Sequence, residues 1–159
     1  MEDVTKNPPI YCNITPSAIN QYQWNVAIRG PPESYYHGGI FFLCIRFPVD
    51  YPFKAPQVFF TTRIFHPSID RRGRISLAIL RSWRAGQTIS KGYIIHICLT
   101  IILYHTNIYS VLLSICDALC EPEIDGPLMP HIANIFTTDR YRFGALAREW
   151  TEKYANYVH

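Results

Sequence analysis

The stretch HGGIFFLCIRFPVDYPFKAPQVFFTT, residues 37–62, contains two apolar runs separated by a proline-rich turn. The first run spans 40–48 and ends at Pro48, and the second spans 57–62. Short runs rich in aromatic and β-branched residues, bounded by glycine and proline, are typical of β-strands. The stretch therefore predicts two strands that follow one another in the chain.

The residues on the N-terminal side extend this pattern. In QYQWNVAIRG, residues 21–30, the alternation of Tyr22, Trp24, Val26 and Ile28 predicts a strand with one apolar face. GPPESYYHGG, residues 30–39, is a turn with two prolines and two glycines. Strands separated by turn signals, without a long helix between them, predict an antiparallel meander.

Helical patterns dominate the C-terminal half. VLLSICDALC, residues 111–120, has apolar residues at helical spacing, and a short helix is expected after Pro130. Residues 138–158 predict an amphipathic helix with Asp139 near its start and an aromatic core face of Tyr141, Trp150 and Tyr154. Strands first and helices after indicate an α+β fold, and a length of 159 residues fits a single domain over 1–159.

The composition excludes several classes of protein. The chain is 48% hydrophobic and 17% charged with a net charge of +3, and its basic residues are scattered apart from Arg71, Arg72 and Arg74. We expect these three arginines to form a solvated loop tip, and we expect no nucleic-acid partner.

The 5 cysteines share no metal-ligand spacing, so no metal and no cofactor are expected. Buried free thiols, and a start without a signal-peptide pattern, favour the cytoplasm and/or the nucleus.

One segment challenges this interpretation. Residues 92–116 contain no Asp, Glu, Lys or Arg, and YIIHICLTIILY lies at their centre. A membrane-spanning helix needs about 20 predominantly apolar residues. Because His96, His105 and several polar residues interrupt the run, membrane association is the weaker alternative to a buried segment.

Several segments together resemble a known family. YHGGIFFLCIRFPVDYPFKAPQVFFTTRIFHPSI, GRISLAIL, LLSICDALCEPEIDGPL and DRYRFGALAREWTEKYA resemble the ubiquitin-conjugating enzyme family, in its small single-domain class. The resemblance covers nearly the whole chain except 92–110 and a short start. It implies a four-stranded antiparallel sheet flanked by helices. It also implies an activity in which a cysteine accepts ubiquitin from an activating enzyme and passes it to a lysine with a ligase's help.

The catalytic position departs from the family. The family's cysteine follows Gly-x-Ile-Cys-Leu, whereas this chain has Gly73-Arg74-Ile75-Ser76-Leu77. A thiol is roughly a few per cent ionised at neutral pH and a hydroxyl is not. Ser76 could accept ubiquitin as an oxyester if a base activated it, but an ester is a poorer acyl donor than a thioester. The resemblance therefore implies a divergent member that lacks the catalytic cysteine and is impaired or inactive.

Two further catalytic positions also differ. The family places an asparagine after His-Pro to stabilise the oxyanion, and here Ser68 follows His66 and Pro67. The serine arm is shorter, and His66 and Pro67 are expected to be structural. In the later acidic loop Asp125 is the remaining acid, while Gly126 takes the place of the other.

The resemblance also implies docking positions. Phe53 matches the ligase-binding aromatic, and Arg84 and Ala85 belong to a second ligase-binding loop that lacks the family's proline. The first helix is expected to be truncated, which would weaken binding to the activating enzyme and to RING- or HECT-type ligases. An apolar insertion, 92–110, falls at the start of the central helix, where it could extend that helix or loop out.

Three hypotheses follow for the function. The first is a ubiquitin-conjugating-like protein of the ubiquitination pathway that is impaired because Ser76 replaces the thioester-forming cysteine. The second is an active enzyme that transfers ubiquitin to substrate lysines. The third is a non-enzymatic protein that binds ubiquitin or ligases, or that associates with membranes through its insertion.

Overall fold

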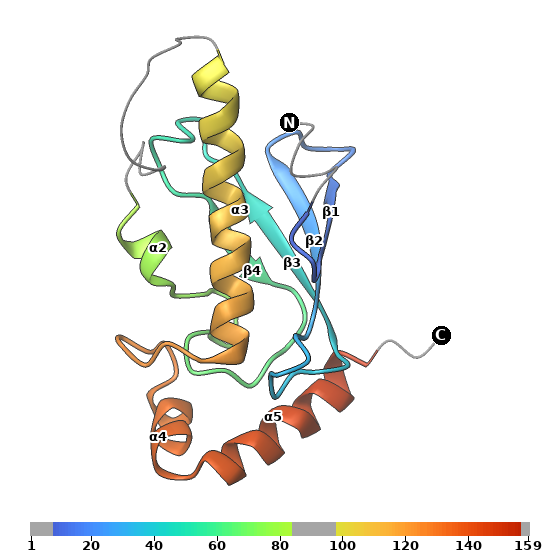
Figure 1. The fold of residues 1–159 in the computed structure, drawn as a ribbon, viewed down its shortest axis with the longest axis vertical. Coiled ribbons are helices and arrows are strands. Elements are labelled where there is room, and N and C mark those ends of the chain that lie inside the picture. Colours follow the sequence, from blue (N-terminus) through green and yellow to red (C-terminus); the bar gives the residue numbers. More distant parts are fainter. Residues whose placement is uncertain (1–7, 84–97, 157–159) are drawn as a thin grey trace.

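The structure is a computed structural model that describes residues 8–83 and 98–156, with side chains described for 8–83 and 108–156. Strands come first along the chain and helices follow (Figure 1). The strands are β1 (Cys12–Pro16), β2 (Gln23–Arg29), β3 (Ile40–Arg46) and β4 (Gln57–Phe60). The helices are α2 (Ala78–Arg81), α3 (Cys98–Cys120), α4 (Pro130–Thr138) and α5 (Arg140–Tyr154). The α+β fold class expected from the sequence is confirmed.

The strands form one antiparallel sheet in the order β1-β2-β3-β4. This order confirms the meander predicted from the alternation of apolar residues, and the fourth strand implied by the family resemblance is β1. Trp24, Val26 and Ile28 of β2 are buried as predicted, whereas Tyr22 lies before the strand and is 47% exposed.

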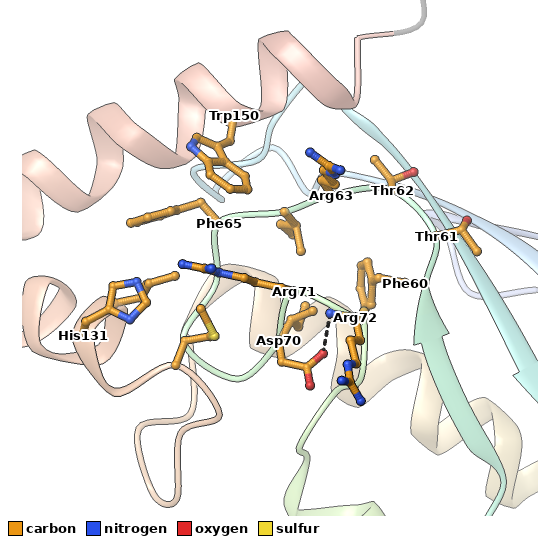
Figure 2. A pocket seen from close by; sticks show the side chains of 15 residues that line it. Phe60, Thr61, Thr62, Arg63, Phe65, Asp70, Arg71, Arg72, His131 and Trp150 are labelled. Carbon is orange, nitrogen blue, oxygen red and sulfur yellow. Dashed lines mark hydrogen bonds between the residues drawn. The ribbon is translucent and has the colours of Figure 1, made fainter.

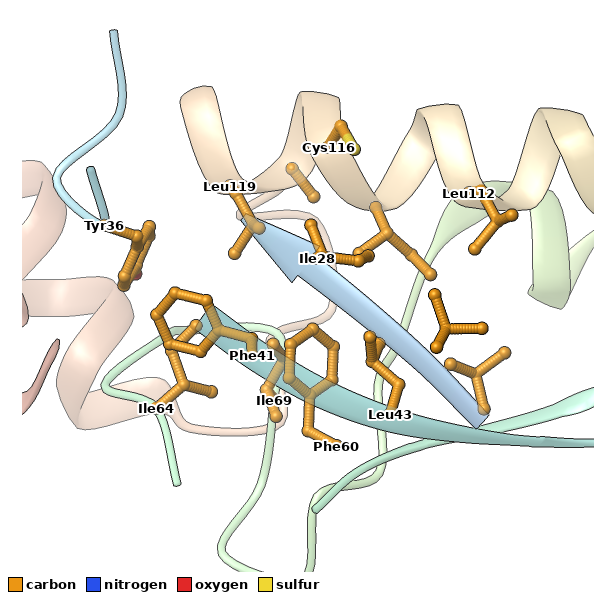
Figure 3. Packing of buried hydrophobic residues seen from close by; sticks show 14 of the residues in the cluster. Ile28, Tyr36, Phe41, Leu43, Phe60, Ile64, Ile69, Leu112, Cys116 and Leu119 are labelled. Carbon is orange, nitrogen blue, oxygen red and sulfur yellow. The ribbon is translucent and has the colours of Figure 1, made fainter. Parts of the chain in front are cut away.

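Helix α3 lies across one face of the sheet (Figure 1). Figure 3 shows Leu112 and Leu119 of this helix pointing towards the strands that carry Ile28 and Leu43. Burying an aliphatic side chain of this kind contributes about 1.5–3 kcal/mol, so the contact between α3 and the sheet stabilises the fold. It also fixes the C-terminal end of α3 close to the loop that carries Ser76.

The apolar insertion continues α3 over the part of it that the structure describes. The helix begins at Cys98 and runs without interruption to Cys120, so residues 98–110 extend the central helix rather than loop out. Residues 92–97, and residues 1–7 where the truncated first helix was expected, lie outside the described residues. None of the helices in the described ranges is long and apolar enough to cross a bilayer.

Asp139 joins the last two helices. Its backbone N–H donates to the carbonyl of Ile135 and ends α4, and its carboxylate accepts from the Arg142 N–H at 2.9 Å and begins α5. The helix predicted over 138–158 is therefore present from Arg140, with Asp139 as its N-cap. The predicted aromatic core face is wrong at Tyr141, which is 86% exposed because the first turn of α5 turns this position to solvent.

Candidate functional site

A tight loop, residues 69–75, leads into the candidate site. Ile69 pairs with Ile75 across an isolated bridge, and the Gly73 N–H donates to the Asp70 carbonyl at 2.9 Å. Gly73 has a φ of +79°, and a Cβ there would lie 1.9 Å from the Phe60 carbonyl oxygen. A glycine is therefore required at this position both by the backbone conformation and by the contact with β4.

Asp70 stabilises this loop from inside. One carboxylate oxygen accepts the backbone N–H groups of Arg72 and Arg74, each at 2.9 Å, and the other accepts the Arg74 Nε–H at 2.7 Å. Burial alone would raise the pKa of Asp70, but the hydrogen bonds from Arg74 and Arg72 outweigh it and lower the pKa. The loop tip is thus held by a charged side chain that stays ionised at neutral pH.

Ser76 follows this loop and is half-buried. Its backbone N–H donates to the Ser68 carbonyl at 2.9 Å, which brings two of the predicted site residues together. Its Oγ accepts a hydrogen bond from Nη1 of Arg81 at 2.7 Å. Leu77, fully buried, is the N-cap residue of the short helix α2, and this single turn brings Arg81 back over Ser76.

Glu123 reaches the same site from the segment after α3. Its Oε2 accepts the Ala78 N–H at 3.1 Å and lies 3.5 Å from Nη2 of Arg81. Its carbonyl oxygen accepts the Ser68 Oγ–H at 2.7 Å. Sequence reasoning missed both Arg81 and Glu123. The spacing of Arg81 one turn beyond Ser76 was a usable signal for the first, whereas the distant Glu123 gave none.

His66 is completely buried behind Ser68. Its Nδ1 accepts the Ser68 N–H at 3.0 Å, so its Nε2 carries the proton and donates to the Ala118 carbonyl of α3 at 2.9 Å. Burial lowers the pKa of His66 from 6.5 to about 4, although the hydrogen bond to Ala118 works in the opposite direction. The ring is therefore neutral at physiological pH and joins the site loop to the central helix.

The remaining predicted site residues lie around this centre. Pro67 is buried, and its carbonyl accepts the Met129 N–H at 2.9 Å. Asp125 is exposed beside Gly126, which has a φ of +72°. The carboxylate that contacts the Ser76 segment is that of Glu123, two residues before Asp125.

Phe53 lies on the turn between β3 and β4 and is 77% exposed. The indole N–H of Trp83 donates to the Pro52 carbonyl at 2.8 Å, and the Trp83 ring packs 5.9 Å from that of Tyr51. This contact holds the start of the second predicted docking loop against the turn that carries Phe53. Arg84 and Ala85 lie outside the described residues.

No group of three or more His, Cys, Asp or Glu side chains that could hold a metal ion occurs within the residues that the structure describes.

A four-stranded antiparallel meander crossed by a central helix and followed by two C-terminal helices is the architecture of the ubiquitin-conjugating fold. The sequence model described as "Ubiquitin-conjugating enzyme" matches residues 1–151, and the chain belongs to this family. Membership connects the chain with the ubiquitination pathway. In general, members of this family interact with ubiquitin, its activating enzyme and ligases.

Proposed function

We propose that this protein is a ubiquitin-conjugating-type protein that does not relay ubiquitin to lysine at a useful rate, because Ser76 occupies the position of the family's cysteine. The proposal covers the whole chain as one domain. Transfer by this family depends on a nucleophile that ionises near neutral pH and leaves readily when a lysine attacks. A serine hydroxyl meets neither requirement unless its surroundings provide a base.

The hydrogen bond from Arg81 to Ser76 is the observation that carries the proposal. A guanidinium is always protonated in proteins and can only donate, so it cannot accept the proton of the serine hydroxyl. Because Arg81 Nη1 donates to Ser76 Oγ at 2.7 Å, the side chain that hydrogen-bonds to the hydroxyl is a cation and cannot act as its general base. This arrangement favours the inactive hypothesis over the active one.

The arrangement of Ser68 adds a second obstacle. A donor to the oxyanion that forms during acyl transfer is typically worth about 100- to 1,000-fold in rate. Ser68 is 1% exposed, and its hydroxyl already donates to the Glu123 carbonyl at 2.7 Å. In this position it supports the loop after α3, and we propose that it does not serve an oxyanion.

The exposed Phe53 supports a second candidate function, the binding of ligases without catalysis. A large apolar side chain that is 77% exposed is a common mark of an interaction surface. We propose that the Phe53 turn, held by Trp83, retains affinity for RING- or HECT-type ligases. A protein that docks on a ligase but carries no activated ubiquitin would compete with active family members.

We also propose a reducing compartment, the cytoplasm or the nucleus. The cysteines whose side chains the structure describes, Cys12, Cys44, Cys116 and Cys120, are all free thiols.

A charging assay tests the catalytic proposal. The protein is incubated with activating enzyme, ATP and ubiquitin, and the products are separated with and without reducing agent and with and without hydroxide. We expect no adduct, or a slow one that resists reducing agent and is cleaved by hydroxide, as an oxyester is. Ser76→Ala is the control, because it removes the hydroxyl and should abolish any such adduct.

Ser76→Cys separates a lost nucleophile from lost docking. If only the nucleophile is missing, this variant should form an adduct that reducing agent cleaves. Formation of a lysine-linked ubiquitin product by the unaltered protein, at ordinary enzyme concentrations, would overturn the proposal.

A further inference from the structure

A cavity of about 510 Å³ lies beside residues 69–73 of the 69–75 loop. Its walls are residues 60–65, the loop residues 69–73, the start of α4 and Trp150 of α5 (Figure 2). Neither Ser76 nor Phe53 lines it. Its volume falls within the range of about 300–1,000 Å³ typical of ligand pockets.

Apolar side chains form the inner part of this cavity. Ile64, Phe65 and Ile132 are buried, while Trp150 is half-buried and lies 5.7 Å from the Phe65 ring. Figure 2 shows the indole of Trp150 lying over the cavity beside Phe65. A large aromatic surface that is only partly covered can accept a bulky apolar side chain of a partner.

The rim of the cavity is positively charged. Arg63, Arg71 and Arg72 line it and are exposed, and Figure 2 shows the Arg71 side chain extending across the cavity towards His131. In the described parts of the chain, none of these three arginines forms an ion pair. The guanidinium of Arg63 lies 5.6 Å from the centre of the Tyr154 ring, which holds it beside the cavity without neutralising it.

The acidic residue in the lining does not balance these charges. Asp70 already accepts hydrogen bonds from the Arg72 and Arg74 backbone and from the Arg74 guanidinium at 2.7 Å. Its charge is therefore paired with that of Arg74, whose side chain is not part of the lining. The cavity is left with unpaired arginines next to an aromatic surface.

We propose that this cavity binds an acidic peptide segment of a partner protein. An aromatic or aliphatic side chain of this peptide packs on Trp150 and Phe65. Carboxylates that flank this side chain in the peptide pair with Arg71 and Arg72. Arginine is suited to this role because its planar guanidinium binds a carboxylate through two parallel hydrogen bonds. The proposal is independent of the function proposed for Ser76, and its test measures peptide binding and not ubiquitin transfer.

The probe is a synthetic, acetylated and amidated peptide in which one phenylalanine is flanked by two glutamates on each side. Binding to the full chain is followed by amide chemical shifts and by titration calorimetry, at low and at physiological ionic strength. We expect the shifts to centre on residues 60–73 and on the Trp150 indole, and we expect binding to weaken as salt is added. Two matched peptides replace either the glutamates by glutamine or the phenylalanine by alanine, and both should bind at least about tenfold more weakly.

Charge-reversal variants test whether Arg71 and Arg72 bind the peptide. The double variant Arg71→Glu and Arg72→Glu changes exposed side chains, so the protein should fold, and binding should fall by about tenfold or more. Arg142→Glu, an exposed arginine of α5 that does not line the cavity, is the control and should bind as the unaltered protein does. Undiminished binding to the double variant or to the glutamine peptide overturns the proposal. So does binding of inorganic phosphate at the arginines without binding of the peptide, which would identify a small-anion site.

Discussion

Arg81 and Ser76 are joined by a hydrogen bond of 2.7 Å from Nη1 to Oγ, across the single helical turn of α2. The guanidinium stabilises negative charge on whatever atom occupies this position, yet it cannot take up a proton from it. The same arrangement would be enough to favour a thiolate, because a thiol ionises near neutral pH, whereas an alcohol would still need a base to take its proton.

The first prediction concerns a thiol placed at this position. In Ser76→Cys, the positive charge of Arg81 should favour the thiolate and increase the rate of alkylation by iodoacetamide at neutral pH. Adding Arg81→Gln should slow alkylation roughly three- to tenfold. The rate is measured by mass spectrometry on the peptide that contains residue 76, so the other thiols do not contribute. Equal rates in the two backgrounds would show that Arg81 does not act on the nucleophile.

The second prediction concerns Glu123. Glu123→Ala removes the acceptor of the Ala78 N–H and the partner of Arg81, and should lower the free energy of unfolding by about 1–2 kcal/mol. The matched control is Glu121→Ala, which removes an ion pair to Arg140 between side chains that are 70% and 52% exposed. That change should cost less than about 0.5 kcal/mol in urea unfolding. A control as damaging as Glu123→Ala would contradict the role assigned to Glu123.

The third prediction compares two glycines with the same backbone conformation. Gly73 and Gly126 have φ values of +79° and +72°, but a Cβ at Gly73 would lie 1.9 Å from the Phe60 carbonyl oxygen, while one at Gly126 meets nothing within 4 Å. Gly126→Ala should cost about 1 kcal/mol through backbone strain alone. Gly73→Ala should cost about 3 kcal/mol or more, because the loop must also move away from β4. Similar thermal unfolding of the two variants would refute the close approach.

The fourth prediction is a pH dependence of stability that arises from His66. Its pKa is about 4 in the folded protein and near 6.5 when the chain is unfolded, so the unfolded state binds the proton first as the pH falls. Unfolding is therefore favoured progressively between about pH 6.5 and pH 4, and the free energy of unfolding should drop by up to about 3 kcal/mol over that range. The lowered pKa of Asp70 contributes mainly below that range, because the carboxyl of the unfolded chain takes up its proton around and below its ordinary pKa of 3.8.

The variant His66→Gln checks the source of this dependence. It should be less stable at neutral pH, because its amide cannot reproduce both hydrogen bonds of the ring, and its stability should change less between pH 6.5 and pH 4. Chemical unfolding at several pH values measures both effects. The same pH slope in the variant would assign the dependence to other groups.

The fifth prediction concerns Phe53. Phe53→Ala should weaken binding to a RING domain by about tenfold or more if this side chain is an anchor of the docking surface. Because Phe53 is 77% exposed, the free energy of unfolding should change by less than about 0.5 kcal/mol. Ile19→Ala, at a position that is 99% exposed before β2, is the control and should not affect binding. Calorimetry or surface plasmon resonance with an isolated RING domain provides the measurement.

The sheet could largely be predicted from the sequence because its signal is local. Alternation around Trp24, Val26 and Ile28 predicts β2 and its buried face directly. The pattern did not reveal β1, a five-residue strand that ends at Pro16, because so short an edge strand has too few alternating residues to be recognised. Only the family resemblance predicted it.

The start of α3 could not be predicted, since an uncharged, isoleucine-rich segment suits a helix and a strand equally. The packed fold favours the helix. Ile108, near the end of the insertion, is buried in the same core as Leu112, and helix α3 carries both residues.

The candidate site was predicted only in part. His66 and Ser68 were found in one short motif and Ser76 in a second one that follows it, and the structure joins the three residues by hydrogen bonds. The Ser76 hydroxyl is contacted by Arg81, which the turn of α2 orients. Arg81 in turn pairs with Glu123, which follows the C-terminal end of α3. Contacts made across such a distance in the chain depend on the packed fold and leave no local pattern.

The indole hydrogen bond from Trp83 to Pro52 has a consequence for recognition. It holds Trp83 against the turn that carries Phe53, so a partner that contacts Phe53 also meets the Trp83 side chain in a fixed orientation. Substitutions at Phe53 and Trp83 should then be non-additive in their effect on binding. Selectivity for a partner would depend on Trp83 as well as on Phe53.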